Sequence, residues 1–178
     1  MRTVSRLVVL VTLLGLVAGL AQAQVSFPQS VASGDPRPES VVLWTRVAVA
    51  DPAALPRGLQ LEVAADEGFA TVVETRTVDV NPAYDGVVKV LVDGLEPDTF
   101  YFYRFSFGGV VSPVGRTRTA PAADDPRPVR YAVVYCQDYV GRWYNSYAKL
   151  LADHDEDLDF VVQLGDAIYE TTGDPGFQ

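Results

Sequence analysis

Cysteine and histidine are nearly missing from this sequence, which contains one of each in 178 residues. The single cysteine, Cys136, excludes an intrachain disulfide and leaves one free thiol that requires an explanation. The single histidine, His154, stands within an acidic stretch, Asp-His-Asp-Glu-Asp. We therefore predict that His154 is a surface residue and not a metal ligand.

Basic residues are also scarce, since 14 Lys and Arg face 23 Asp and Glu, for a formal charge of −9. Loss of Arg2 and Arg6 with a leader peptide would take this charge from −9 to −11. Such an acidic chain repels nucleic acids and anionic membranes, so we expect neither as a partner. If the substrate is itself an anion, bound metal must supply the local positive charge.

Long apolar runs are absent except at the N-terminus. Residues 7–20 are apolar, Arg2 and Arg6 precede them, and Ala-Gln-Ala follows at 21–23. This pattern predicts a signal peptide over residues 1–23, and hence a secreted or periplasmic protein without a stable membrane anchor once the peptide is cleaved. The run is short for a membrane span, although an uncleaved anchor is the alternative. No twin-arginine pair is present, which favours general secretion.

Residues 24–119 predict an antiparallel β-sandwich. Six short β-branched or aromatic segments are separated by turn signals such as Asp-Pro, Asn-Pro, Asp-Gly and Gly-Gly. The expected strands cover residues 40–47, 59–65, 71–78, 87–91, 99–107 and 110–116.

One short motif sharpens this prediction. Leu95, Pro97, Thr99 and Tyr101 are spaced two apart, immediately before the most aromatic strand. This spacing is typical of a tyrosine corner, in which the phenol hydroxyl bonds back to the preceding chain. It resembles the signature of fibronectin type III-like domains, and we interpret Tyr101 as structural.

The pattern changes after residues 120–128, a linker with three prolines. An apolar strand is expected at 129–135, a helix at 141–153 and a second strand, of the kind buried on both faces, at 160–164. This strand–helix–strand order predicts a right-handed crossover between parallel strands. Residues 129–178 are too few to form a complete sheet of this kind, so we interpret them as a truncated domain.

Three potential metal ligands follow these strands. Cys136 comes after the first strand, Asp166 comes after the second, and Tyr169 lies three residues further on. Parallel strands end at the same edge of a sheet, where open α/β sheets bind ligands, so the three side chains should converge. A thiolate with a phenolate favours a trivalent, iron-like ion, and a carboxylate can bridge to a second ion. His154 falls at the opposite edge.

Two other interpretations remain open for these residues. Asp166 could simply cap the end of a strand while Tyr169 packs against the next helix. Cys136 could have a redox or nucleophilic role, although it lacks a nearby histidine or second cysteine.

Several ordered motifs resemble one known family. These are FPQSVASGDP at 27–36, VVLWTR at 41–46, CQDY at 136–139 and LGDAIYE at 164–170. Together they are similar to the N-terminal part of the alkaline phosphatase D (PhoD-like) phosphatases. The Gly-Asp-x-x-Tyr spacing is also similar to that of purple acid phosphatases.

This resemblance implies a fibronectin III/Ig-like sandwich followed by the start of a calcineurin-like α/β metallophosphatase domain. It implies a secreted enzyme that hydrolyses phosphomonoesters and phosphodiesters with iron and calcium. Cys136 and Tyr169 would bind the iron, and Asp166 would bridge iron and calcium. No catalytic residue separate from these ligands is identified, and the substrate-binding residues are unknown.

The resemblance also implies further Asp, Asn and His ligands beyond residue 178. We therefore expect the 178-residue chain to be inactive by itself, because half of a two-metal site leaves the ions under-coordinated. The alternative is a non-enzymatic extracellular fibronectin III-like binding module that carries a remnant α/β segment.

Overall fold

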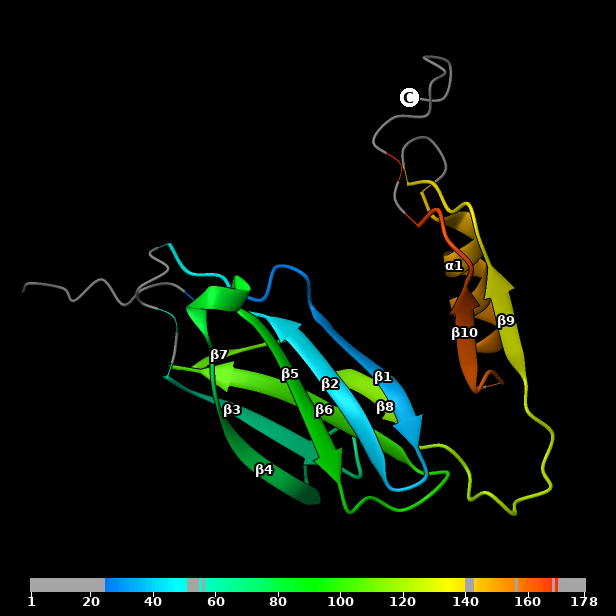
Figure 1. Ribbon diagram of the computed structural model, residues 1–178, viewed down its shortest axis with the longest axis horizontal. Coiled ribbons are helices and arrows are strands. Elements are labelled where there is room, and N and C mark those ends of the chain that lie inside the picture. Colours follow the sequence, from blue (N-terminus) through cyan, green and yellow to red (C-terminus); the bar gives the residue numbers. More distant parts are fainter. Residues whose placement is uncertain are drawn as a thin grey trace, which may run out of the picture.

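The computed structural model describes residues 25–50, 55, 57–139, 143–155, 157–167 and 169. Within them the chain forms a β-sandwich and a separate strand–helix–strand unit, joined by a loop (Figure 1). The predicted signal peptide, residues 1–23, lies outside the described residues. Among the helices of the described part, none has the length and apolar content needed to cross a bilayer.

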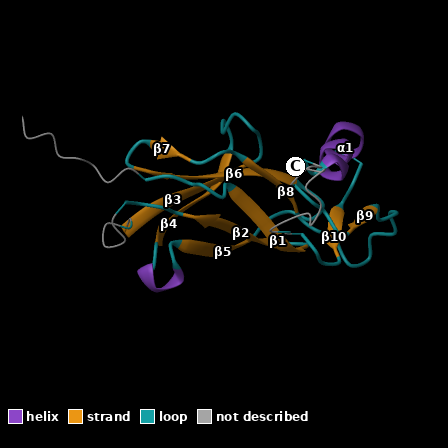
Figure 2. Cartoon of the chain, turned by 90° about the horizontal axis from the view of Figure 1, so that it is seen from above, coloured by secondary structure: helices purple, strands orange, loops and turns teal. Residues whose placement is uncertain are grey.

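The sandwich consists of two antiparallel sheets. The first has the order β1-β2-β5 and contains β1 (Val31–Arg37), β2 (Ser40–Arg46) and β5 (Val87–Asp93). The second has the order β4-β3-β6-β7, with β8 also paired to β6; its members are β3 (Arg57–Ala64), β4 (Val72–Asp79), β6 (Phe100–Phe107), β7 (Val110–Val111) and β8 (Gly115–Arg118). A short 3₁₀-helix, Pro82–Tyr84, precedes β5. In Figure 2, β2 and β5 lie on one side and β6 and β8 on the other.

The core lies between these sheets because alternate residues of each strand point inward. On β5 the inward residues are Val88, Val90 and Val92, each less than 8% exposed. On β6 the inward residues are aromatic, and Tyr103 and Phe105 meet edge to face with ring centroids 6.4 Å apart. The predicted β-sandwich is therefore confirmed.

Two segments differ from the sequence-based expectation. The Asp35-Pro36 signal does not end a strand; it lies inside β1, where the register with β2 shifts between Gly34 and Arg37. Proline is tolerated there because β1 is an edge strand and a bulge needs no ladder bond from it. The single strand expected at 110–116 is instead divided into β7 and β8, since Pro113 between them has no amide hydrogen to donate.

The tyrosine corner is present. The Tyr101 hydroxyl accepts a hydrogen bond from the backbone N–H of Glu96 at 3.0 Å, and Tyr101 is 4% exposed. The Thr119 hydroxyl donates to the carbonyl of Glu96 at 2.6 Å, so both backbone groups of Glu96 are satisfied at this corner.

The second unit contains β9 (Tyr131–Val134), α1 (Asn145–His154) and β10 (Phe160–Gln163). β9 and β10 pair in parallel, from Tyr131 opposite Phe160 to Val134 opposite Gln163. Both arrows in Figure 1 point away from the loop that leads to the sandwich, and Figure 2 shows α1 on one side of the two strands.

β10 is not buried on both faces, contrary to the prediction for residues 160–164. Phe160 and Val161 are 44% and 48% exposed, because among the described residues only α1 covers the two strands. A two-stranded sheet with a helix on one side cannot bury the other side.

Candidate metal centre

Backbone pairing continues beyond the ends of β9 and β10. The N–H of Leu164 donates to the carbonyl of Val134 at 2.9 Å, and the N–H of Cys136 donates to the carbonyl of Gly165 at 3.2 Å. The N–H of Gln137 then donates to the carbonyl of Asp166 at 2.9 Å. These bonds hold the two loops together and bring Cys136 and Asp166 side by side, as the parallel crossover predicts.

Both loops begin with unusual backbone conformations. Cys136 has φ 51° and Asp166 has φ 53°, which is the left-handed region, and Gly165 has φ 126°. Residues other than glycine pay a conformational cost there, on the order of 1–3 kcal/mol. Strained backbone of this kind clusters at functional sites, and here it occurs at the two residues whose side chains meet.

The side chains of the three predicted ligands converge. The Cys136 thiol donates to Oδ2 of Asp166 across 3.4 Å. The pKa of Tyr169 is raised above its usual value of 10, first by a hydrogen bond with Cys136, then by desolvation and by the negative charge of Asp166. Asp166 and Tyr169, which are 30 and 33 positions from Cys136 in the chain, thus both contact its side chain.

The site opens into a shallow cleft of about 370 Å³, lined by Tyr135, Cys136, Leu164, Gly165 and Asp166. Cys136 and Asp166 are exposed, and Tyr169 is 37% exposed. The lining of this cleft, as far as the structure describes it, includes no Lys or Arg. An anionic ligand would therefore need positive charge from another source.

Two tyrosines at the start of α1 also bond to β10 and the loop that follows it. The Tyr144 hydroxyl donates to the carbonyl of Ala167 at 3.2 Å, directly after Asp166. Gln163 donates to the Tyr147 hydroxyl at 2.7 Å and accepts from the N–H of Gly165 at 3.1 Å. Tyr144 and Tyr147 are three residues apart, a spacing that indicates a helix but does not indicate their bonds to β10 and the loop after it.

The donor set fits one side of a first-row transition-metal ion. A thiol, a carboxylate and a phenol provide soft and hard donors within reach of one another, a combination that suits iron. In the described part of the chain, no group of three or more His, Cys, Asp and Glu side chains could hold a metal, and the third donor here is a phenol. Calcium takes six to eight oxygens, so these residues could contribute only part of its shell, through the Asp166 carboxylate.

His154 lies away from this centre. It is the last residue of α1, is exposed, and its Nδ1 is 3.6 Å from a carboxylate oxygen of Asp157. Since Asp157 precedes β10, His154 lies near the edge opposite to Cys136 and Asp166, as predicted.

Comparison with known proteins gives a consistent result. A family described as "PhoD-like phosphatase, N-terminal domain" matches residues 16–121. Alkaline phosphatase D of Bacillus subtilis (strain 168) is 43% identical over an alignment that covers 81% of this chain and 25% of the relative. A solved structure titled "Structure of PhoD" superposes with a TM-score of 0.70 at 41% identity, covering 80% of this chain and 28% of that one. The chain thus spans about a quarter of the length of each.

Proposed function

Because the chain belongs to the PhoD-like phosphatases, through their N-terminal domain, we propose that it forms part of a metal-dependent phosphoesterase. The observation that carries this proposal is the convergence of Cys136, Asp166 and Tyr169 at the carboxyl edge of two parallel strands. In this proposal, residues 129–178 begin a calcineurin-like α/β metallophosphatase domain, and residues 24–119 form a fibronectin III-like sandwich.

The three side chains have separate roles in the proposed site. Cys136 and Tyr169 would bind iron through sulfur and the phenol oxygen, and Asp166 would offer its two oxygens to iron and calcium. The bound ions would offset substrate charge and make hydroxide available from bound water at neutral pH. Among the described residues that line the cleft there is no basic side chain, so a phosphate ester would depend on the metals for its binding.

The substrates we propose are phosphomonoesters and phosphodiesters, hydrolysed outside the cytoplasm after export by the signal peptide at residues 1–23. N-terminal sequencing of the exported protein should find Gln24 first. An unprocessed N-terminus would favour the uncleaved anchor.

The enzymatic proposal is tested with the full-length gene product and two chromogenic esters, p-nitrophenyl phosphate and bis(p-nitrophenyl) phosphate. We expect hydrolysis of at least one ester, and a loss of at least about 100-fold in kcat/KM with Asp166→Asn. The matched control is Asp79→Asn, an exposed aspartate on β4 of the sandwich, which should retain wild-type activity. Absence of hydrolysis in the wild-type protein would contradict the proposal and favour a binding module.

A further inference from the structure

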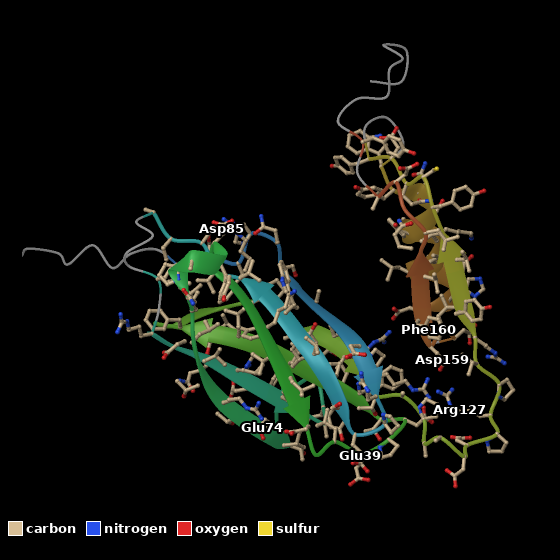
Figure 3. All side chains as sticks on the ribbon, in the orientation of Figure 1. Glu39, Glu74, Asp85, Arg127, Asp159 and Phe160 are labelled. Atoms are coloured by element: carbon tan, nitrogen blue, oxygen red, sulfur yellow. The ribbon has the colours of Figure 1, made fainter. Side chains whose placement is uncertain are left out.

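Six charged residues connect the sandwich to the strand–helix–strand unit, and we refer to them as the charged joint. The sandwich and its following loop contribute Asp98, Arg116, Arg118 and Arg127, while the second unit contributes Asp155 and Asp159. Figure 3 shows Arg127 and Asp159 close together at the base of the unit, beside Phe160.

Asp159 is at the centre of this joint. Its Oδ1 accepts from Nη1 of Arg127 at 2.8 Å and from Nη1 of Arg118 at 3.2 Å, and its side chain is 12% exposed. Asp98 adds ion pairs to the same two guanidinium groups at 2.8 and 3.0 Å. A partly buried carboxylate shared by two arginines is held much more firmly than an exposed ion pair.

Asp159 also joins the amino ends of the two site strands. Its Oδ2 accepts from the backbone N–H of Arg130 at 2.8 Å, and its own N–H donates to the carbonyl of Arg130 at 2.8 Å. Arg130 immediately precedes β9, and Asp159 immediately precedes β10. Each strand is four residues long, about 13 Å, and ends at the candidate metal centre.

Other contacts across the joint are few. The apolar core of the sandwich, as far as the chain is described, includes no residue of the second unit, and no described strand of one part pairs with a strand of the other. A cleft of about 500 Å³ separates them, lined by Phe100 on one side and Leu158 on the other. A second attachment is Arg116, which pairs with Asp155 at the end of α1 at 2.8 Å. The charged joint, and not apolar packing, therefore sets the orientation.

We propose that Asp159 is a positioning residue for the candidate metal centre, because it ties the amino ends of β9 and β10 to each other and to the sandwich through Arg118 and Arg127. The inference rests on the proposed function, because positioning matters only if Cys136 and Asp166 bind a metal ion. The sandwich then serves as the fixed base from which the site strands project.

Some polar atoms of the charged joint lack hydrogen-bond partners, so the joint contributes only modestly to the stability of the whole chain. Nε of Arg118 and Nε of Arg127 are buried without a hydrogen-bond partner, and the ion pairs to Oδ1 of Asp98 lack hydrogen-bond geometry. Each buried donor without a hydrogen-bond partner carries a desolvation cost, which offsets part of the stabilisation that the ion pairs contribute. We therefore expect variants of Asp159 to fold.

The test compares Asp159→Asn with Asp85→Asn. Asp85 also pairs with an arginine, Arg46, at 3.0 Å, but it lies elsewhere on the sandwich (Figure 3). Hydrogen exchange in the 178-residue chain should become at least about 10-fold faster in β9 and β10 of Asp159→Asn, with β2 and β5 unchanged. Asp85→Asn should leave exchange in β9 and β10 unchanged.

A titration of the full-length gene product with cobalt(II) chloride, monitored by visible absorption, measures metal binding at the site itself. We expect the apparent affinity of Asp159→Asn to fall about 10- to 100-fold while Asp85→Asn matches wild type. Unchanged exchange in β9 and β10 of Asp159→Asn, or equal acceleration in β2 and β5, would overturn the positioning role. If wild-type protein binds no cobalt, the proposed metal centre fails, whereas the exchange result still decides the role of Asp159.

Discussion

The sulfur of Cys136 lies 3.4 Å from Oδ2 of Asp166, although 30 residues separate them in the chain. Two parallel strands deliver these residues to one edge, and three backbone hydrogen bonds beyond the strands hold their loops together. The contact is therefore a product of the crossover and not of local sequence. The chemistry proposed for the site depends on it.

Gly165 should be essential for this contact. Its φ of 126° is strained for any L side chain, although a Cβ there would meet no atom within 4 Å. Gly165→Ala should therefore shift the loop and loosen the bond from the Cys136 N–H to the Gly165 carbonyl. Strain of about 1–3 kcal/mol corresponds to about 5- to 150-fold faster hydrogen exchange at Cys136 and Gln137.

Gly34→Ala is the control for this substitution, since Gly34 also has open space around it but does not have a positive φ. Exchange at Cys136 should be unchanged in that variant. Equal exchange rates in Gly165→Ala and wild type would show that the loop geometry does not depend on glycine.

The tyrosine corner should stabilise the sandwich measurably. Tyr101→Phe removes the acceptor for the N–H of Glu96, a part-buried hydrogen bond, and should lower the free energy of unfolding by about 0.5–1.5 kcal/mol. Denaturant unfolding followed by tryptophan fluorescence measures this change. Tyr84→Phe, at a position 66% exposed, should have no effect. A wild-type midpoint for Tyr101→Phe would remove the structural role assigned to this residue.

The charged joint should weaken in acid. The pKa of Asp159 lies below its usual 3.8, mainly through the backbone N–H of Arg130 and then through Arg127, with further help from Arg118. Because the folded pKa is the lower one, its stabilisation is complete above the unfolded value near 4 and is lost as pH falls through the folded pKa. The groups facing it are Arg118, Arg127 and the Arg130 backbone, and these arginines keep their charge throughout.

Hydrogen exchange of β9 and β10, corrected for intrinsic rates, should therefore accelerate in wild type as the pH falls below about 4. Asp66 and Asp85, whose pKa values are also lowered, belong to the sandwich and should affect its own strands. In Asp159→Asn the acid dependence of β9 and β10 should disappear. Its persistence in that variant would assign the effect to another group.

The sequence predicted most strands and the tyrosine corner, but it did not predict a strand that depends on its neighbour. Alternating apolar residues and the Leu-x-Pro-x-Thr-x-Tyr motif were sufficient for the sandwich and its corner, because both are local patterns. β1 was missed because Gly34, Asp35 and Pro36 are turn residues, and only pairing with β2 makes that segment a strand. β1 and β2 are neighbours in the chain, but β1 itself has no alternation of apolar residues, so its strand conformation comes from the pairing and not from its own residues.

The candidate ligands could be predicted from the sequence, but the residue that positions them could not. Cys136, Asp166 and Tyr169 were indicated by their positions after two apolar strands, and the structure brings them together. Their assignment as iron and calcium ligands remains a prediction. The role of Asp159 was not predictable, because it follows an acidic segment and such aspartates are usually solvated surface residues. Its significance comes from Arg118 and Arg127, which lie 41 and 32 residues away.

The central claim is that Cys136, Asp166 and Tyr169 bind one iron ion, and a titration of the full-length gene product with ferric citrate tests it most directly. We predict a visible phenolate-to-iron absorption band that saturates at one equivalent. The band should disappear in Tyr169→Phe and persist in Tyr135→Phe, which removes an exposed phenol beside Cys136. Absence of the band in wild type, or an unchanged band in Tyr169→Phe, would contradict the account.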